Sequence, residues 1–158
     1  MQNISQKIAV FFLLSLCSIA LAQAQPLASR TSTASLYLQR GNEWYAKGEY
    51  ARAEADFTLA IATTPTEAQA YYNRATARFL LKKLNEALND FDLAIHHNPR
   101  MIEAYVNRAV THYLLSHWDE AIQDCDQALA MNPNLAAAWI NRGLARLDKG
   151  DSANALAD

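Results

Sequence analysis

Asparagine residues recur at a fixed spacing and offer a chemistry suited to peptide recognition. They are Asn73, Asn107 and Asn141, each 34 positions after the one before. An amide side chain both donates and accepts hydrogen bonds, so a row of amides matches a peptide backbone without reading its side chains. The alternative is that asparagine only fills this column of a helix, because short motifs are weak indicators of function.

The residues that usually carry catalysis are missing from the sequence or unsuitably spaced. The chain has no CxxC pair, no glycine-rich phosphate loop and no Ser/His/Asp order. No two histidines stand at the i, i+4 spacing of a helical zinc site; the four are His96, His97, His112 and His117. We therefore predict no catalytic residue, no metal site and no cofactor, and interpret the histidines as surface and inter-helix residues.

Arginine and aspartate form two further columns with the same period. Each arginine precedes an aspartate by 16 residues, which predicts an ion pair between two helices, and arginine can hold a carboxylate through two hydrogen bonds. The four pairs are Arg40 with Asp56, Arg74 with Asp90, Arg108 with Asp124, and Arg142 with Asp158. The alternative is that both columns lie on solvated helix faces, where ion pairs stabilise little.

The charge balance excludes one large class of partners. The chain has 14 basic and 16 acidic residues in a total of 158, whereas nucleic-acid binding usually needs a clustered basic face. We therefore predict no nucleic-acid partner. The length fits one small domain.

Pairs of helices, repeated every 34 residues, are the elements that position these columns. Apolar residues at helical spacing predict a first helix around Leu36 to Trp44 and a second around Tyr50 to Ile61, with Gly48 at the turn. Small residues should let the two helices cross closely, Gly41 opposite Ala53. Proline should begin each following pair, because it is tolerated in the first turn of a helix; the prolines are Pro65, Pro99 and Pro133. The predicted units are residues 34–67, 68–101, 102–135 and, in part, 136–158.

The period and its columns resemble the tetratricopeptide repeat. Its pattern has an aromatic, a small residue four places on, then alanine, an aromatic, alanine and proline. The columns here are Tyr37, Tyr71, Tyr105 and Trp139; Gly41, Ala75, Ala109 and Gly143; Ala53, Ala87, Ala121 and Ala155; and Ala60, Ala94 and Ala128. The resemblance implies an all-α solenoid of stacked antiparallel helix pairs in a right-handed superhelix, with first helices lining a concave side.

The resemblance also implies which residues face the concave side. That surface is apolar and aromatic with amides at intervals, and we predict that it binds a peptide segment or partner protein. The predicted binding residues are Asn42, Tyr72, Asn73, Phe79, Val106, Asn107, Tyr113, Ile140 and Asn141. The same surface is completed by Leu38, Tyr45, Thr76, Val110, Leu144 and Leu147.

Two groove chemistries of the family match this chain differently. Relatives that clamp the C-terminal carboxylate of heat-shock chaperones use two asparagines and three basic residues. Asn42 and Asn73 fit the asparagines, but Leu38, Glu103 and Asn107 stand where the basic residues are wanted. The clamp is therefore absent, and Glu103 would repel a carboxylate. The asparagine column instead resembles the ladder in the repeats of O-linked N-acetylglucosamine transferase, where amides hold a peptide backbone.

The first 24 residues have the architecture of a secretory signal peptide. Lys7 and the amino terminus give the chain a positively charged start, and an apolar run extends from Ile8 to Ala22. Ala22-Gln23-Ala24 then supplies small residues for cleavage. The alternative is a retained membrane anchor, but the run of 15 residues is shorter than the ~20 that span a bilayer. Residues 25–33 are predicted to form a flexible lead-in.

Cleavage would leave one cysteine and an exported chain without a membrane span. Cys125 could then form no internal disulfide; it is most simply a small core residue, and a reactive thiol is the alternative. No Asn-x-Ser/Thr site follows residue 24, which favours a bacterial periplasm over a eukaryotic secretory route.

These observations predict a non-catalytic interaction module in an exported compartment. The alternative is a structural assembly piece. Repeat arrays need a polar cap at each end, and the partial last unit offers little cover for its apolar residues. It would then stack on another copy or on a larger envelope complex.

Removal of the leader is directly testable. We expect the native protein to begin at Gln25, because the charged start, the apolar run and the small residues at the cleavage site occur in the order that signal peptidase recognises. Intact-mass measurement of the protein from its native host checks this. A mature species that still carries residues 11–16 would contradict it.

Overall fold

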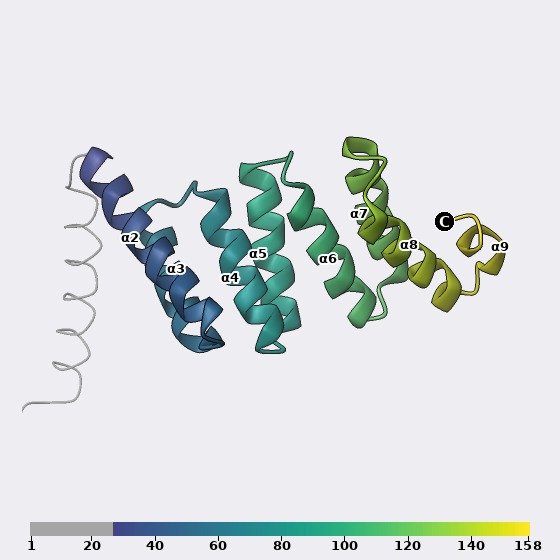
Figure 1. The fold of residues 1–158 in the computed structure, drawn as a ribbon, viewed down its shortest axis with the longest axis horizontal. Helices are drawn as coiled ribbons and strands as arrows, with labels where there is room; N and C mark the ends of the chain where they lie inside the picture. The colour runs from purple at the N-terminus through teal and green to yellow at the C-terminus, as the bar shows by residue number, and fades with distance from the viewer. Residues whose placement is uncertain (1–26) are drawn as a thin grey trace, which may run out of the picture.

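The computed structural model describes residues 27–158, which form a row of antiparallel helix pairs (Figure 1). The helices are α2 (Leu27–Ala46), α3 (Tyr50–Thr63), α4 (Ala68–Leu80), α5 (Leu84–His97), α6 (Ile102–Leu114), α7 (Trp118–Met131), α8 (Ala136–Lys149) and α9 (Ser152–Ala155). The predicted all-α stack of helix pairs is confirmed. The predicted signal peptide lies outside the described residues.

The first helix is longer than expected. It begins at Leu27 and has 20 residues, against 13 or 14 in each of the helices α3 to α8. The prediction of a flexible lead-in is therefore wrong for residues 27–33. Once a helix exists, each added residue gains a hydrogen bond without a new nucleation cost, so a stretch rich in serine and threonine can extend it. None of the helices within residues 27–158 has the length and hydropathy that a membrane crossing requires.

The turn inside each unit ends the first helix with a left-handed residue. Gly48 and Gly150 have φ of +77° and +93°, and Lys82 and Ser116 occupy the same column with φ of +63° and +61°. The predicted turn at Gly48 is confirmed. Glycine adopts this conformation without the steric cost that a side chain brings.

Three prolines, Pro65, Pro99 and Pro133, lie in the loops between units and not in a helix. Pro65 stands three residues before Ala68, where α4 begins, so the prediction that proline opens the next helix is wrong. In the later loops the side chains of Asn98 and Asn132 accept hydrogen bonds from the backbone N–H two residues on, at 3.2 Å and 3.1 Å. These local bonds, together with the fixed φ of proline, favour a turn over a continued helix.

One column of the second helices fills the centre of the stack. Phe57, Phe91 and Cys125 stand 34 residues apart and are each fully buried. Burial raises the pKa of the Cys125 thiol to about 12. Because the thiolate is the reactive form, this environment supports the core interpretation of Cys125 and opposes the reactive-thiol alternative.

Position 41 requires a residue as small as glycine, because an aromatic ring lies against it. A methyl group added at Gly41 would stand 2.5 Å from a ring carbon of Phe57, so Phe57, more than the predicted Ala53, makes the small residue necessary. At Gly143, the same column of the last unit, an added methyl would meet its nearest atoms at an ordinary 3.5 Å. The same residue type is therefore required in one unit and not in the other.

All four predicted ion pairs are present. The closest nitrogen–oxygen distances are 2.6 Å for Arg40–Asp56, 2.7 Å for Arg74–Asp90, 2.5 Å for Arg108–Asp124 and 2.5 Å for Arg142–Asp158. The aspartate side chains are only 2–7% exposed. The solvated-face alternative is therefore wrong for the aspartate column.

Three of the arginines also bind the preceding unit. Arg108 Nη1 donates to Asp92 at 2.6 Å, Arg142 Nη1 donates to Asp126 at 2.5 Å, and Arg74 Nη1 donates to the Thr58 hydroxyl at 3.2 Å. The sequence analysis missed this second contact, although Thr58, Asp92 and Asp126 share the 34-residue period and lie 16 residues before each arginine. The same side chain thus ties two helices of one unit to the unit before.

A pair of glycine substitutions tests the helix crossing. Gly41→Ala should lower the free energy of unfolding by ~1–3 kcal/mol, because the methyl group must displace the buried ring of Phe57. Gly143→Ala is the matched control. It adds the same methyl without a clash and should be neutral or stabilising by up to ~1 kcal/mol. Urea denaturation measures both, and equal effects would show that the ring contact is unimportant.

A double-mutant cycle tests the buried ion pair. Arg74→Ala and Asp90→Ala should each destabilise the fold by ~3 kcal/mol, because each leaves a buried charge without its main partner. Their coupling should be ~1–3 kcal/mol. The exposed pair Arg52–Glu49, at 3.9 Å, is the control and should show no measurable coupling. Equal coupling in the two cycles would restore the solvated-face interpretation.

Candidate functional site

Residues from three successive first helices enclose two adjoining pockets. One pocket of about 200 Å³ is lined by Tyr45, Thr76, Phe79, Leu80, Phe91, Asn107 and Val110. The second, of about 310 Å³, is lined by Asn42, Tyr45, Phe57, Tyr72, Asn73 and Thr76. Tyr45 and Thr76 line both, so the pockets adjoin one another, and together we call them the groove.

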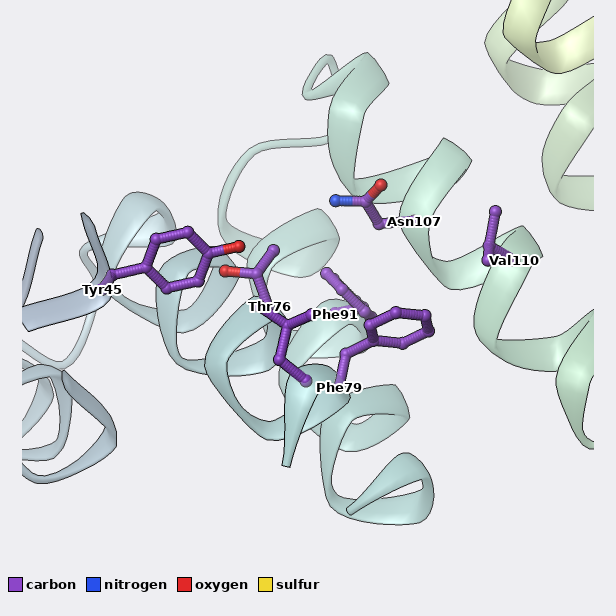
Figure 2. Close-up of a pocket in the computed structure, with 7 residues that line it drawn as sticks. Tyr45, Thr76, Phe79, Phe91, Asn107 and Val110 are labelled. Atoms are coloured by element: carbon purple, nitrogen blue, oxygen red, sulfur yellow. The ribbon is translucent and has the colours of Figure 1, made fainter. Parts of the chain in front are cut away.

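The first pocket has an apolar floor and a mixed rim. Figure 2 shows Tyr45 of α2 on one side of Thr76 of α4, with Asn107 and Val110 of α6 on the other side. Phe91, from the second helix α5, is fully buried and closes the pocket from below. The arrangement offers an apolar depression beside one amide, which suits an apolar side chain next to a peptide bond.

Two members of the predicted amide row, Asn73 and Asn107, each bond to the first helix of the preceding unit, but to different groups. Asn73 Nδ2 donates to Asn42 Oδ1 at 2.9 Å, and Asn73 Oδ1 accepts from Gln69 at 2.7 Å. Asn107 Nδ2 donates instead to the Tyr72 hydroxyl at 3.0 Å. An amide nitrogen has two hydrogens. Since these bonds use one hydrogen of each Nδ2, Asn73 and Asn107 each keep a second N–H for a ligand.

Four of the nine predicted binding residues do not line the groove. Val106 packs against the buried cluster of Ala109, Cys125 and neighbours that joins units three and four. Ile140 lines a separate pocket between α8 and α9. Tyr113 donates a hydrogen bond to Asp148 at 2.6 Å, and Asn141 is half-buried on α8. The structure therefore brings five of them together in the groove and leaves four outside it. The five are Asn42, Tyr72, Asn73, Phe79 and Asn107, and the four are Val106, Tyr113, Ile140 and Asn141.

Three groove residues were outside the predicted surface. Leu80 is at the end of α4, and Phe57 and Phe91 come from the second helices. The common column of Phe57 and Phe91 was a signal in the sequence, but it indicated only burial. A second-helix residue reaches the groove because the facing residue on the first helix is small, as Gly41 is for Phe57.

Tyr72 in the groove and Tyr113 on α6 both have a raised pKa. Burial, followed by the nearby charge of Glu103, raises the pKa of Tyr72. The hydrogen bond to Asp148 raises the pKa of Tyr113. Both phenols therefore keep their protons at neutral pH and can act as hydrogen-bond donors.

Histidine supplies one close pair outside the groove. His112 Nδ1 and His117 Nδ1 are 3.4 Å apart at the turn between α6 and α7, and burial lowers the pKa of His112. Within residues 27–158 no three His, Cys, Asp or Glu side chains gather in a group that could hold a metal ion.

The comparison with protein families identifies the repeat. The family described as tetratricopeptide repeat matches residues 68–101 and 102–135. Residues 68–135, the second and third predicted units, are therefore tetratricopeptide repeats. Such repeats build a non-catalytic fold, so the expectation that the chain is not an enzyme now rests on these repeats as well as on its residues.

Solved tetratricopeptide-repeat structures resemble this protein over most of its length. The first such domain of Spaghetti (RPAP3), bound to the HSP90 peptide SRMEEVD, has 27% identity and a TM-score of 0.74, covering 76% of this chain and 95% of that one. The second domain of human RPAP3, in complex with the HSP70 peptide SGPTIEEVD, has 26% identity and a TM-score of 0.69, covering 75% and 97%. MamA, at 20% identity and a TM-score of 0.77, covers 99% and 90% and shows the fold alone. Among curated proteins no match was found.

Proposed function

We propose that this protein is an exported interaction module that binds an extended segment of a partner protein in its groove. The observation that carries the proposal is the pair of amides, Asn73 and Asn107, each with one N–H left over beside an apolar pocket. Main-chain hydrogen bonds hold a segment of any sequence, while a pocket selects among its side chains. No chemistry beyond binding is required of these residues.

The likeness to peptide-bound domains supports this use of the groove. The two RPAP3 domains carry peptides that end in Glu-Glu-Val-Asp. The present groove cannot hold such a terminus in the same way, because Leu38, Glu103 and Asn107 occupy the columns where basic residues are needed. The expected ligand is therefore an internal segment, held through its backbone.

Export is part of the proposal and rests on residues 1–24 of the sequence. A chain that leaves the cytosol would meet a different set of partners from cytosolic chaperone-binding domains. The loss of the carboxylate clamp agrees with that expectation. The bacterial periplasm is the compartment we propose.

The end of the stack supports a second candidate, self-assembly. Ile140, Leu144, Leu147 and Leu156 are 62%, 45%, 53% and 91% exposed and share one pocket with Trp139. An exposed apolar cluster of this kind is typical of an interface. Sedimentation of the mature protein separates the candidates, since groove binding needs only a monomer, whereas assembly through α8 and α9 gives a mass that rises with concentration.

Removing the two amides tests the groove. Asn73→Ala with Asn107→Ala should weaken binding of the partner captured by crosslinking in the native host by about tenfold to a hundredfold, because each lost hydrogen bond contributes ~1 kcal/mol. Isothermal calorimetry gives the Kd. The matched control is Asn85→Ala with Asn89→Ala, two exposed asparagines on α5, which should leave the Kd unchanged. Undiminished binding by the groove variant, with its fold verified by circular dichroism, would refute the proposal.

A further inference from the structure

The groove of this protein contains no charged side chain, and the arginine side chains of the first helices form ion pairs outside it. None of the residues that line the two pockets is charged. The arginines on α4, α6 and α8 are all bonded to acids outside the groove: Arg74 and Arg78 to Asp90, Arg108 to Asp124, and Arg142 and Arg146 to Asp158. These arginines therefore supply no unpaired positive charge to the groove.

Acidic side chains, by contrast, stand near both ends of α6. Glu103 is exposed in the first turn of α6, one helical turn before Asn107. Tyr72 lines the groove on the neighbouring α4, and its pKa is raised first by burial and then by the charge of Glu103. Near the other end, Tyr113 donates to Asp148 at 2.6 Å, which fixes that carboxylate beside α6.

We propose that the groove selects a segment with one apolar side chain for the pocket and lysine or arginine on both sides of it, directed to Glu103 and Asp148. This inference rests on the proposed function and names the chemistry of its ligand. It is the reverse of the acidic termini bound by the RPAP3 domains. Charge complementarity of this kind acts on specificity and on the association rate.

The dimensions of the site agree with such a segment. The pocket of about 200 Å³ exceeds the ~150 Å³ cavity that holds a benzene molecule, so it accommodates one leucine-sized or aromatic side chain. Along α6, Val110 lies ~10 Å from Glu103 and ~5 Å from Tyr113 at 1.5 Å per residue. Because an extended chain advances ~3.3 Å per residue, each cation should lie within about four positions of the apolar residue.

A random peptide library is the probe for this proposal. Twelve-residue peptides displayed on phage are selected on the mature protein at low salt, and in parallel on three variants. The first, Val110→Trp, fills the pocket. The second, Glu103→Gln with Asp148→Asn, removes the charges and keeps an acceptor for Tyr113. The third, Glu103→Lys with Asp148→Lys, reverses them.

We expect the wild-type selection to enrich peptides with an apolar residue flanked by lysine or arginine. An enriched peptide should bind the neutral variant about tenfold more weakly at low salt, and this difference should shrink at 0.5 M salt because exposed charges are screened. The charge-reversed variant should enrich acidic peptides instead.

The outcomes separate the inference from the proposed function. Peptides that need the pocket but show no preference for basic residues, or prefer acidic ones, would overturn the inference and leave peptide binding in the groove intact. Selection that is the same on the wild type and on Val110→Trp, or that enriches nothing, would overturn both. Folding of each variant is verified by its melting temperature, so that a loss of binding reports on the site.

Discussion

A buried carboxylate needs a cation, and this requirement organises every unit of the chain. Removing an aspartate from water costs several kcal/mol unless its oxygens are paired and hydrogen-bonded. Here Asp56, Asp90 and Asp124 of the second helices each accept two hydrogen bonds from an arginine of the first, and Asp158, which follows α9, pairs with Arg142. The geometry is satisfied only when the two helices cross at one rotation and one height. The ion pair therefore sets the register of the helix pair, while burial of alanine and phenylalanine provides most of the stabilisation.

The same arginine connects one unit to the next. Arg108 contacts Asp124 in its own unit and Asp92 in the unit before, and its guanidinium lies 5.6 Å from the centre of the Tyr105 ring. A planar group with five donors can make these contacts at once, whereas lysine could not. Because the arginines are engaged on this side of their helices, the groove side is left to amides, hydroxyls and apolar groups. The chemistry of the groove thus follows from how the stack is held together.

The sequence predicted what depends on the period and missed what depends on the rotation of single side chains. The helix pairs and the four ion pairs follow from columns 34 residues apart, and all were found. The period does not say which residue reaches across a helix crossing, so Phe57 and Phe91 were not expected in the groove, and Val106 was expected there although it packs in the core. Likewise, Asn107 was expected to continue the amide row, but the tyrosine at position 72 is near enough to accept its hydrogen bond. The start of α2 at Leu27 was missed because serine and threonine disfavour a helix only weakly.

Columns that repeat and columns that vary have different roles in this chain. The arginine and aspartate columns are the same in all four units, because each unit must solve the same packing problem. The column of Glu103 contains Ser35, Gln69 and Ala137 in the other units, and the column of Asp148 contains Ala46, Leu80 and Leu114. A charge that occurs once in a column adds nothing to the common packing, and both of these charges lie at the surface. Residues of this kind give each unit of a repeat protein its own binding chemistry, since they can change without disturbing the contacts that the stack requires.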